Sequence, residues 1–177
     1  NYFYIVMEFI EGINLREFIN LSKQKNISIS TALVYEIGKN IFEALTYAHH
    51  HSSGKILHKD ISPHNVMISK NGSIVLIDFG ISEIFASDNT LHKSGKPAYL
   101  PTRILNGIKK YDESIDMYSL GVVLFELATS VKVQSENDLK LEIVLDQICR
   151  EVIESLIFFE GDYEIFNKRQ ATLQTSV

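Results

Sequence analysis

The chain has 177 residues, enough for about one domain, and its 45% hydrophobic and 22% charged residues are typical of a globular protein. Its 22 acidic residues outnumber its 17 Lys and Arg residues, and the net charge of −5 argues against nucleic acid as a partner. The single cysteine, Cys149, excludes an internal disulfide framework and a cysteine-based zinc site, which favours a reducing, cytoplasmic location.

The first half of the chain predicts one strand and two helices. Residues 2–7 are apolar, β-branched and aromatic, which is typical of a buried strand. Residues 15–21 predict a short helix. Residues 30–51 predict a longer helix, because apolar residues recur on one face at three- and four-residue steps: Leu33, Val34, Ile37, Ile41, Leu45 and Ala48.

The second half predicts a β-hairpin, a long loop and two helices. Residues 66–68 and 74–77 are typical of two strands, and Asn71-Gly72 between them is a strong turn signal. Residues 80–100 show no period and predict a long loop, which is usually functional in a compact domain. Helices are predicted at 114–130, which is apolar nearly all round and hence buried, and at 138–159. No stretch reaches the roughly 18 uninterrupted apolar residues of a membrane span.

Polar side chains suited to phosphate chemistry gather in three short segments. These are the runs HKDISPHN at 58–65, DFG at 78–80 and DMYSLG at 116–121. Asp60 and Asn65 lie in one loop, and the predicted hairpin brings Asp78 to the same end of the strands. Carboxylate and amide oxygens suit Mg²⁺, which keeps few protein ligands besides phosphate oxygens. One carboxylate then remains to accept a hydroxyl proton.

These motifs resemble those of the C-terminal lobe of eukaryotic-type Ser/Thr protein kinases of bacteria. The family motifs H-R-D-L-x-x-x-N, D-F-G and D-x-x-S-L-G occur here in the same order. The resemblance implies an α+β fold, mainly helical, with a small β-hairpin and a hinge strand. It divides the chain into the last N-lobe strand and hinge at 1–14, the C-lobe at 15–170 and a frayed tail at 171–177. Within the C-lobe, the catalytic loop is 56–65 and the activation segment is 78–103.

The resemblance also implies ATP and Mg²⁺ as cofactors, a protein substrate as partner, and a role for individual residues. Asp60 would be the catalytic base, while Asn65 and Asp78 would hold the metal ions. Asp116 would tie down the catalytic loop by accepting its backbone N–H groups. The positions implied to bind the nucleotide are Glu8, Ile10, Asn14, Met67 and Asp78.

Several parts of the family pattern are absent or altered in residues 1–177. There is no glycine-rich loop, no strand lysine and no partner glutamate, so we expect a missing N-lobe to be required for phosphoryl transfer. Ser62 stands where the family has a catalytic-loop lysine, and Lys96 stands where it usually has a threonine. Taken together, this pair predicts that Lys96 returns the missing cation to the γ-phosphate, the alternative being a solvated loop lysine.

The activation segment ends in a degraded A-P-E motif, with Arg103 in place of the family glutamate. If Arg103 faced Arg169, the pair would be like-charged and would splay apart or be solvated. This favours a first alternative, a pseudokinase or binding module. A second alternative is a small-molecule phosphotransferase of the aminoglycoside- or choline-kinase type. The consecutive His49, His50 and His51 point in different directions on a helix, which favours a structural or solvated role over metal binding.

Overall fold

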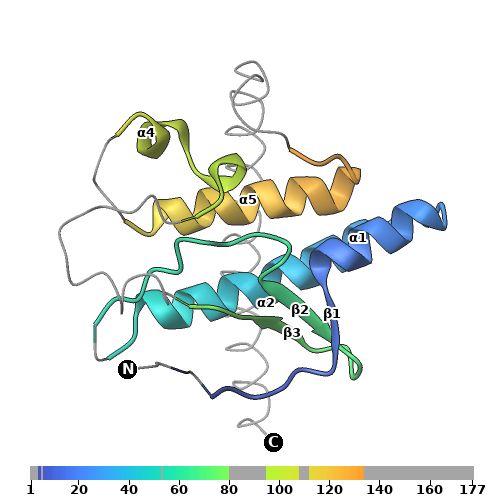
Figure 1. Ribbon diagram of the computed structural model, residues 1–177, viewed down its shortest axis with the longest axis horizontal. Coiled ribbons are helices and arrows are strands. Elements are labelled where there is room, and N and C mark those ends of the chain that lie inside the picture. The colour runs from blue at the N-terminus through green and yellow to red at the C-terminus, as the bar shows by residue number, and fades with distance from the viewer. Residues whose placement is uncertain (1–3, 5, 53, 80–94, 108–111, 134–177) are drawn as a thin grey trace, which may run out of the picture.

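A computed structural model describes residues 4, 6–52, 54–79, 95–107 and 112–133. The predicted helix at 138–159, the predicted tail at 171–177 and residues 80–94 of the predicted activation segment lie outside these residues. The described elements follow in the order β1 (Gly12–Asn14), α1 (Leu15–Gln24), α2 (Thr31–His49), β2 (Val66–Ser69), β3 (Ile74–Leu76), η1 (Pro97–Tyr99), α4 (Thr102–Leu105) and α5 (Ser114–Thr129) (Figure 1). The predicted α+β class is confirmed: helices pack against one small antiparallel sheet.

Local capping fixes where the first two helices begin. The side chain of Asn14 accepts a hydrogen bond from the Glu17 backbone N–H at 2.9 Å, and the Glu17 carboxylate accepts one from the Asn14 N–H. This reciprocal arrangement satisfies two N–H groups that a helix start would leave unpaired. Ser30 caps α2 in a simpler way, since its hydroxyl accepts from the Leu33 N–H. Both predicted helices are thus confirmed, with α1 extending to Gln24.

The three strands form a sheet in the order β1-β2-β3, with both pairs antiparallel. The hairpin between β2 and β3 turns at Asn71-Gly72, as predicted, with Gly72 at a φ of 86° that favours glycine. Gly12 in β1 pairs with Ser69, and a Cβ there would lie 2.1 Å from the Ile68 carbonyl oxygen. Only glycine therefore lets the chain after the hinge approach β2 this closely.

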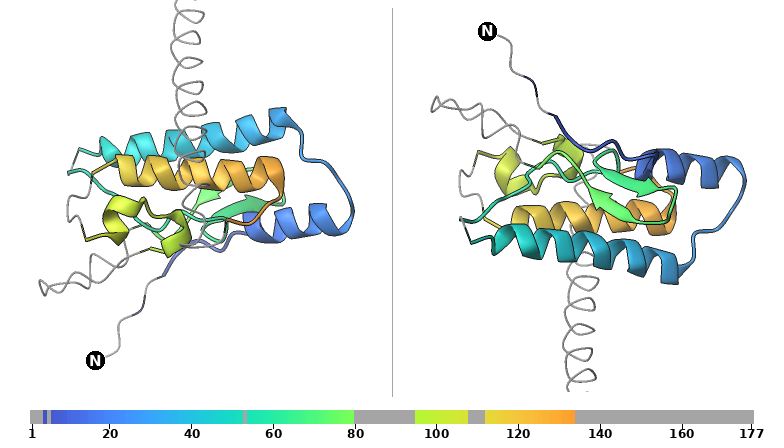
Figure 2. Two further views of the ribbon diagram at one scale, coloured as in Figure 1. Left: turned by 90° about the horizontal axis from the view of Figure 1, so that it is seen from above. Right: turned by 90° about the horizontal axis from the view of Figure 1, so that it is seen from below.

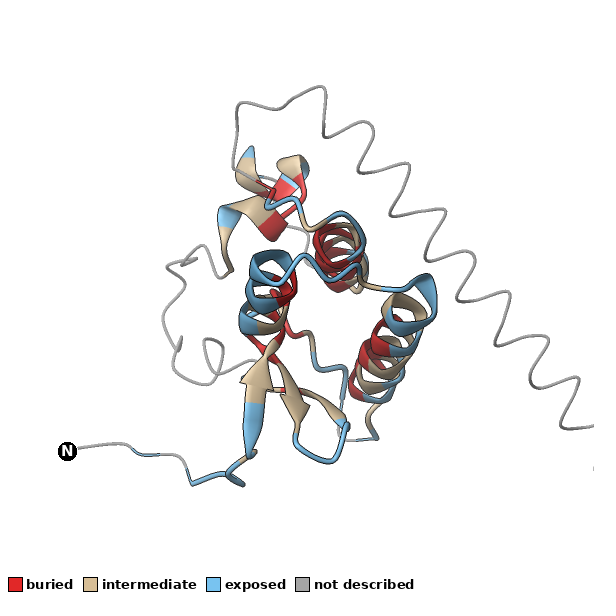
Figure 3. Cartoon of the chain, turned by 90° about the vertical axis from the view of Figure 1, so that its right-hand side faces the viewer, coloured by how far each residue is buried: buried red, intermediate tan, exposed pale blue. Residues whose placement is uncertain are grey.

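The hydrophobic core lies between the helices and one face of the sheet. Helix α5 runs beside α2, as both views in Figure 2 show, and α2 also contacts β3. Buried positions of the helices face inward, whereas exposed positions face outward (Figure 3). Ten of the sixteen residues of α5 are buried, which confirms the prediction of an enclosed helix. No helix in the described part of the chain combines the length and the apolar character needed to cross a membrane.

The predicted buried strand at 2–7 is wrong for the residues that the structure describes there. Tyr4, Val6 and Met7 are in no strand, and their side chains are 85%, 86% and 59% exposed. The sheet begins only at Gly12, because a strand needs a neighbour to pair its backbone N–H and C=O groups. Among the described residues, β2 offers that neighbour to Gly12–Asn14 and none offers it to Tyr4, Val6 or Met7. These residues therefore have the composition of a strand but no strand beside them to pair with in the described part of the chain.

Candidate active site

The loop between α2 and β2 holds Asp60 and Asn65 together as one unit. The Asn65 side-chain Nδ2 donates to the Asp60 carboxylate at 2.9 Å and to the Asp60 backbone oxygen at 2.7 Å. The Asn65 backbone is anchored as well, since its N–H donates to Ser62 and its carbonyl accepts from Ile77. Both amide hydrogens of Asn65 are thus used within the loop. The amide oxygen is left as the group that can bind a cation, and an oxygen is the ligand type that Mg²⁺ takes.

Asp116, in α5, holds the start of this loop through hydrogen bonds to its backbone. Its carboxylate is fully buried in α5 and accepts from the backbone N–H of His58 at 2.9 Å and of Lys59 at 2.8 Å. A third contact, 2.8 Å, joins it to Nε2 of His49 at the end of α2. The interpretation of Asp116 as the anchor of the loop is confirmed. The buried His49 has a structural role and not a metal-binding one, although its partner lies 67 residues away in the chain and no local pattern predicts the contact.

Two residues of the site have backbone conformations that L-amino acids seldom adopt. Lys59 has a φ of 64° and Asp78 a φ of 63°. Such conformations cost free energy and concentrate at functional sites, where the surrounding contacts maintain them. Lys59 is held by Asp116, and Asp78 follows Ile77, whose backbone bonds both His58 and Asn65. Asp78 is exposed and therefore open to a ligand at the end of the hairpin.

His58 connects the loop to the segment that carries Asp78. Its Nε2 lies 2.9 Å from the Ile77 carbonyl oxygen, its Nδ1 accepts from the Asp60 N–H at 3.3 Å, and its ring lies 4.7 Å from that of Phe79. Both hydrogen bonds are satisfied when the ring is neutral with its proton on Nε2. Burial lowers the pKa of His58 below 6.5, against the smaller opposing effects of the Ile77 carbonyl and of Asp116 and Asp60.

We expect the stability of the chain to fall as the pH drops below 6.5, partly through His58. Because the folded-state pKa is below the unfolded value, the unfolded chain binds the proton more readily, and stability rises with pH in this window. One such proton gives a slope of at most about 1.4 kcal/mol per pH unit. Urea unfolding at pH 7.5 and 5.5 should show a smaller loss in His58→Gln than in the wild type. Equal losses would contradict the prediction.

Lys96, which directly precedes η1, contacts the same loop. Its ammonium donates to the Ser62 hydroxyl at 2.7 Å and is 4.0 Å from the Asp60 carboxylate. The adjacent Gly95 has a φ of 99°, and a Cβ there would lie 2.5 Å from the Lys59 carbonyl oxygen. The structure thus brings together four of the predicted site residues, Asp60, Ser62, Asn65 and Lys96.

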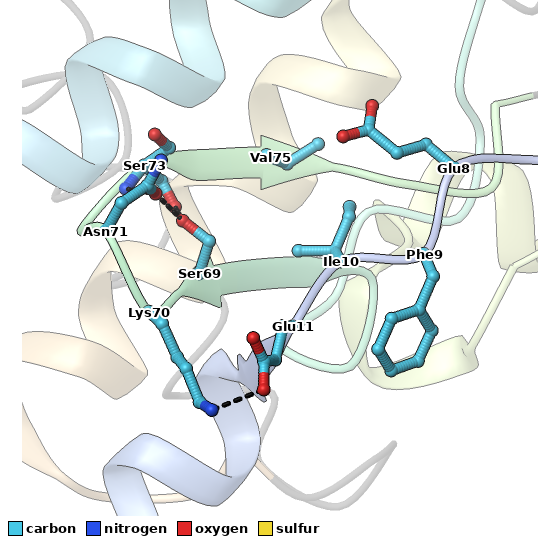
Figure 4. Close-up of a pocket in the computed structure, with 9 residues that line it drawn as sticks. All are labelled: Glu8, Phe9, Ile10, Glu11, Ser69, Lys70, Asn71, Ser73 and Val75. Atoms are coloured by element: carbon cyan, nitrogen blue, oxygen red, sulfur yellow. Dashed lines mark hydrogen bonds and ion pairs between the residues drawn. The ribbon is translucent and has the colours of Figure 1, made fainter.

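Residues 8–11 form one wall of an open cavity of about 410 Å³ beside the sheet (Figure 4). The lining residues are Glu8, Phe9, Ile10 and Glu11 from the segment before β1 and Ser69, Lys70, Asn71, Ser73 and Val75 from the hairpin. Glu8 and Ile10 are two of the residues predicted to contact adenine. Met67 is not in the lining, but it pairs directly with Val75 and so lies on the same face of the sheet. Asn14 also pairs with Met67, and its side-chain oxygen is engaged in capping α1.

Arg103 has a local partner that the sequence analysis missed. Its guanidinium is 3.0 Å from the Asp112 carboxylate and also bonds the Ser114 hydroxyl. The Ser114 hydroxyl and Arg103 together lower the pKa of Asp112. Arg169, the residue considered as its counterpart, lies outside the described residues. Arg103 thus takes part in an ion pair that joins α4 to the start of α5.

A buried ion pair between Arg16 and Glu126 was also missed. The Arg16 guanidinium, with 11% of the side chain exposed, bonds the fully buried Glu126 carboxylate and donates to the Tyr99 hydroxyl at 2.9 Å. The Tyr99 hydroxyl donates to the same carboxylate at 3.0 Å, and the Val133 N–H donates to its other oxygen at 2.7 Å. Burial and the neighbouring carboxylate raise the pKa of Tyr99. A glutamate within an otherwise apolar helix was the signal that could have predicted a buried partner.

Comparison with known proteins identifies the class. The family model for the protein kinase domain matches residues 1–173. The chain is 32% identical over 157 residues to the probable serine/threonine-protein kinase PknB of Lactococcus lactis, covering 87% of this chain and 23% of that protein. It is 36% identical over 131 residues to the serine/threonine-protein kinase PrkC of Bacillus subtilis, covering 72% of this chain and 19% of that protein.

The chain therefore belongs to the protein kinase family, and these two relatives are named serine/threonine-protein kinases. A similar level of identity, 32% over 129 residues, relates it to cyclin-dependent kinase 2 of Caenorhabditis elegans, with 72% of this chain and 34% of that protein covered. The chain spans about a fifth of the length of the two bacterial relatives.

Proposed function

We propose that this chain is the C-terminal lobe of an ATP-dependent kinase that phosphorylates Ser or Thr hydroxyls of a protein. The observation that carries the proposal is the Asp60–Asn65 unit. Asp116 anchors the start of its loop by accepting from the Lys59 N–H, and the Lys96 ammonium lies 4.0 Å from the Asp60 carboxylate. It provides one carboxylate and one free amide oxygen within a single rigid loop. The names of the relatives support the Ser/Thr class of substrate.

In the proposed reaction, Asp60 accepts the proton of the substrate hydroxyl as that oxygen attacks the γ-phosphorus of ATP. The bond from the γ-phosphorus to the bridging oxygen breaks, and ADP leaves with that oxygen. Asn65, through its amide oxygen, and Asp78, through its exposed carboxylate, are the residues proposed to hold Mg²⁺. The bound metal would neutralise charge on the phosphate oxygens.

The nucleotide is proposed to lie between the hinge and the exposed face of the sheet. Glu8 and Ile10 would offer backbone groups to adenine, Met67 would form the floor, and Asn14 would contact the nucleotide at the start of α1. The cavity lined by Glu8, Ile10 and Val75 supports this placement. The glycine-rich loop and the lysine that clamp the phosphates are absent from residues 1–177 and would have to come from an N-lobe.

The test uses residues 1–177 alone and the same residues joined behind a kinase N-lobe, the two-lobed protein. We expect no ATP turnover from residues 1–177 and Mg²⁺-dependent phosphorylation of a Ser- or Thr-containing protein by the two-lobed form. Asp60→Asn should lower kcat by about 10²–10⁴-fold, the usual contribution of a general base. Glu43→Gln, an exposed carboxylate on α2, is the matched control and should leave kcat unchanged.

Three outcomes would count against the proposal. Turnover by residues 1–177 that is lost in Asp60→Asn would show that no N-lobe is needed. Nucleotide binding by the two-lobed protein without phosphorylation of any protein would favour the pseudokinase alternative. Phosphorylation of an aminoglycoside or choline, but of no protein, would favour a small-molecule phosphotransferase.

A further inference from the structure

The loop between Asp60 and Asn65 contains no lysine or arginine of its own. Its intervening residues are Ile61, Ser62, Pro63 and His64. Developing negative charge on a transferred phosphoryl group needs a fixed positive charge or hydrogen-bond donor close by. In the described part of the chain, the cation seated on this loop is Lys96, at 2.7 Å from the Ser62 hydroxyl and 4.0 Å from the Asp60 carboxylate. It reaches the loop from a segment 34 residues further along the chain.

Contacts on both sides of Lys96 fix its backbone. On one side, Gly95 packs against the Lys59 carbonyl so closely that a Cβ would lie 2.5 Å from it. On the other side, the Lys96 carbonyl accepts from the Tyr99 N–H at 2.9 Å, and the Tyr99 carbonyl accepts from the buried Ser119 hydroxyl at 2.7 Å. The stem of Lys96 therefore starts from a defined point. These contacts place the Lys96 side chain where its ammonium group reaches the buried Ser62 hydroxyl.

The ammonium group also has the capacity for a further ligand. Lysine carries three donors, of which the Ser62 hydroxyl takes one, while the Asp60 carboxylate at 4.0 Å is beyond hydrogen-bond distance. The side chain is 43% exposed, so its tip is open to a bound phosphate. Ser62 is fully buried and serves as the fixed support.

We infer that Lys96 is a catalytic residue that donates to the γ-phosphoryl group, and that this charge is present only when residues 95–100 are docked on the catalytic loop. The inference rests on the proposed function. Its consequence is regulatory: a cation on the catalytic loop itself would be in place whether or not residues 95–100 are docked, whereas Lys96 belongs to residues 95–100. Docking of residues 95–100 thus completes the phosphate site.

The direct test uses the two-lobed protein and an ATP analogue that carries an acyl group on its γ-phosphate. This analogue labels any lysine that lies beside the γ-phosphate when it is bound. A nearby lysine amine attacks the acyl carbon, the bond from that carbon to the phosphate oxygen breaks, an amide forms and ATP leaves. We expect mass spectrometry to find the label on Lys96 and on the N-lobe lysine, with ATP protecting both. In the double variant Ser62→Lys with Lys96→Thr, the label should move to position 62.

Labelling separates the failure of this inference from the failure of the proposed function. Label on the N-lobe lysine but not on Lys96 would overturn the inference while nucleotide binding stood. Absence of ATP-protected label at both positions would overturn the proposed function. Lys23, exposed on α1, is the internal control and should show no ATP protection.

Kinetics provide the second readout. Lys96→Ala should lower kcat by about 10²–10³-fold, the loss seen when one preorganised transition-state donor is removed, while KM for ATP changes little. The double variant Ser62→Lys with Lys96→Thr should recover much of the rate. Lys23→Ala is the control. A kcat of Lys96→Ala within about twofold of the wild type, as for a surface substitution, would overturn the inference.

The dependence on docking has its own variant. Gly95→Ala forces residues 95–100 away from Lys59, so it should lower kcat and remove the ATP-protected label from Lys96. In the background of Ser62→Lys with Lys96→Thr, the same change should cost distinctly less activity, because the cation no longer depends on the segment. Equal losses in the two backgrounds would reject the regulatory part.

Discussion

Replacing Asp116 by alanine is expected to destabilise the chain by at least about 3 kcal/mol. The carboxylate is fully buried and accepts from two backbone N–H groups and from His49. Each buried donor left without a partner costs about 1–3 kcal/mol. A domain of this size has only about 5–15 kcal/mol of stability in total, so the loss removes a large part of it. Urea unfolding of residues 1–177 measures the change.

The matched control for Asp116 is Asp112→Asn, which removes a carboxylate from the exposed rim of the same helix start. Its partners are Arg103 and Ser114, and surface pairs of this kind contribute about 0–1 kcal/mol. Asp116→Asn provides a second variant that keeps the shape of the side chain. It removes part of the interaction, because only one of its two terminal atoms can still accept a hydrogen bond. A loss below about 1 kcal/mol for Asp116→Ala would show that water or a rearranged loop satisfies the three donors.

Replacing Glu126 by leucine is expected to cost about 3–5 kcal/mol, because it leaves the nearly buried Arg16 charge without an opposite charge beside it. Two further donors, the Tyr99 hydroxyl and the Val133 N–H, lose their acceptor at the same time. The double variant Arg16→Met with Glu126→Leu should recover a large part of this loss, since well-packed apolar residues often replace a buried pair without cost. Thermal and urea unfolding of the single and double variants measure the coupling.

The same variants test whether the Arg16–Glu126 ion pair holds the segment that carries Lys96 in place. Arg16 also donates from its backbone N–H to the carbonyl of Pro63, in the loop that holds Asp60 and Asn65, at 3.0 Å, and Tyr99 belongs to the segment that carries Lys96. We therefore expect faster amide hydrogen exchange at Tyr99 and Leu100 in Glu126→Leu than in the wild type. Additive losses in the double variant, with unchanged exchange, would contradict a role for the pair in holding this segment.

Local features of the sequence determined much of the fold. The helices at 15–24, 31–49 and 114–129 follow from periodic or continuous apolar residues, with Asn14 and Ser30 as caps. The hairpin follows from Asn71-Gly72 between two β-branched runs. Asp60, Asn65 and Asp116 could be assigned together because their motifs occur in a fixed order, and because a carboxylate in an apolar helix needs nearby donors. These signals act over a few residues or reflect burial alone.

Only the tertiary structure decided which distant groups meet. The apolar residues at 2–7 looked like a strand, yet among the residues that the structure describes strand pairing begins only at Gly12. Arg16 and Glu126 are 110 residues apart, and their pairing has no local signature, because a side chain in a protein interior takes its partner from whatever element packs against it. Lys96 and Ser62 are 34 residues apart, and they could be linked only through the family pattern at both positions. The sequence thus determined the elements and the reactive residues, while packing decided which charges are buried, paired and placed beside Asp60.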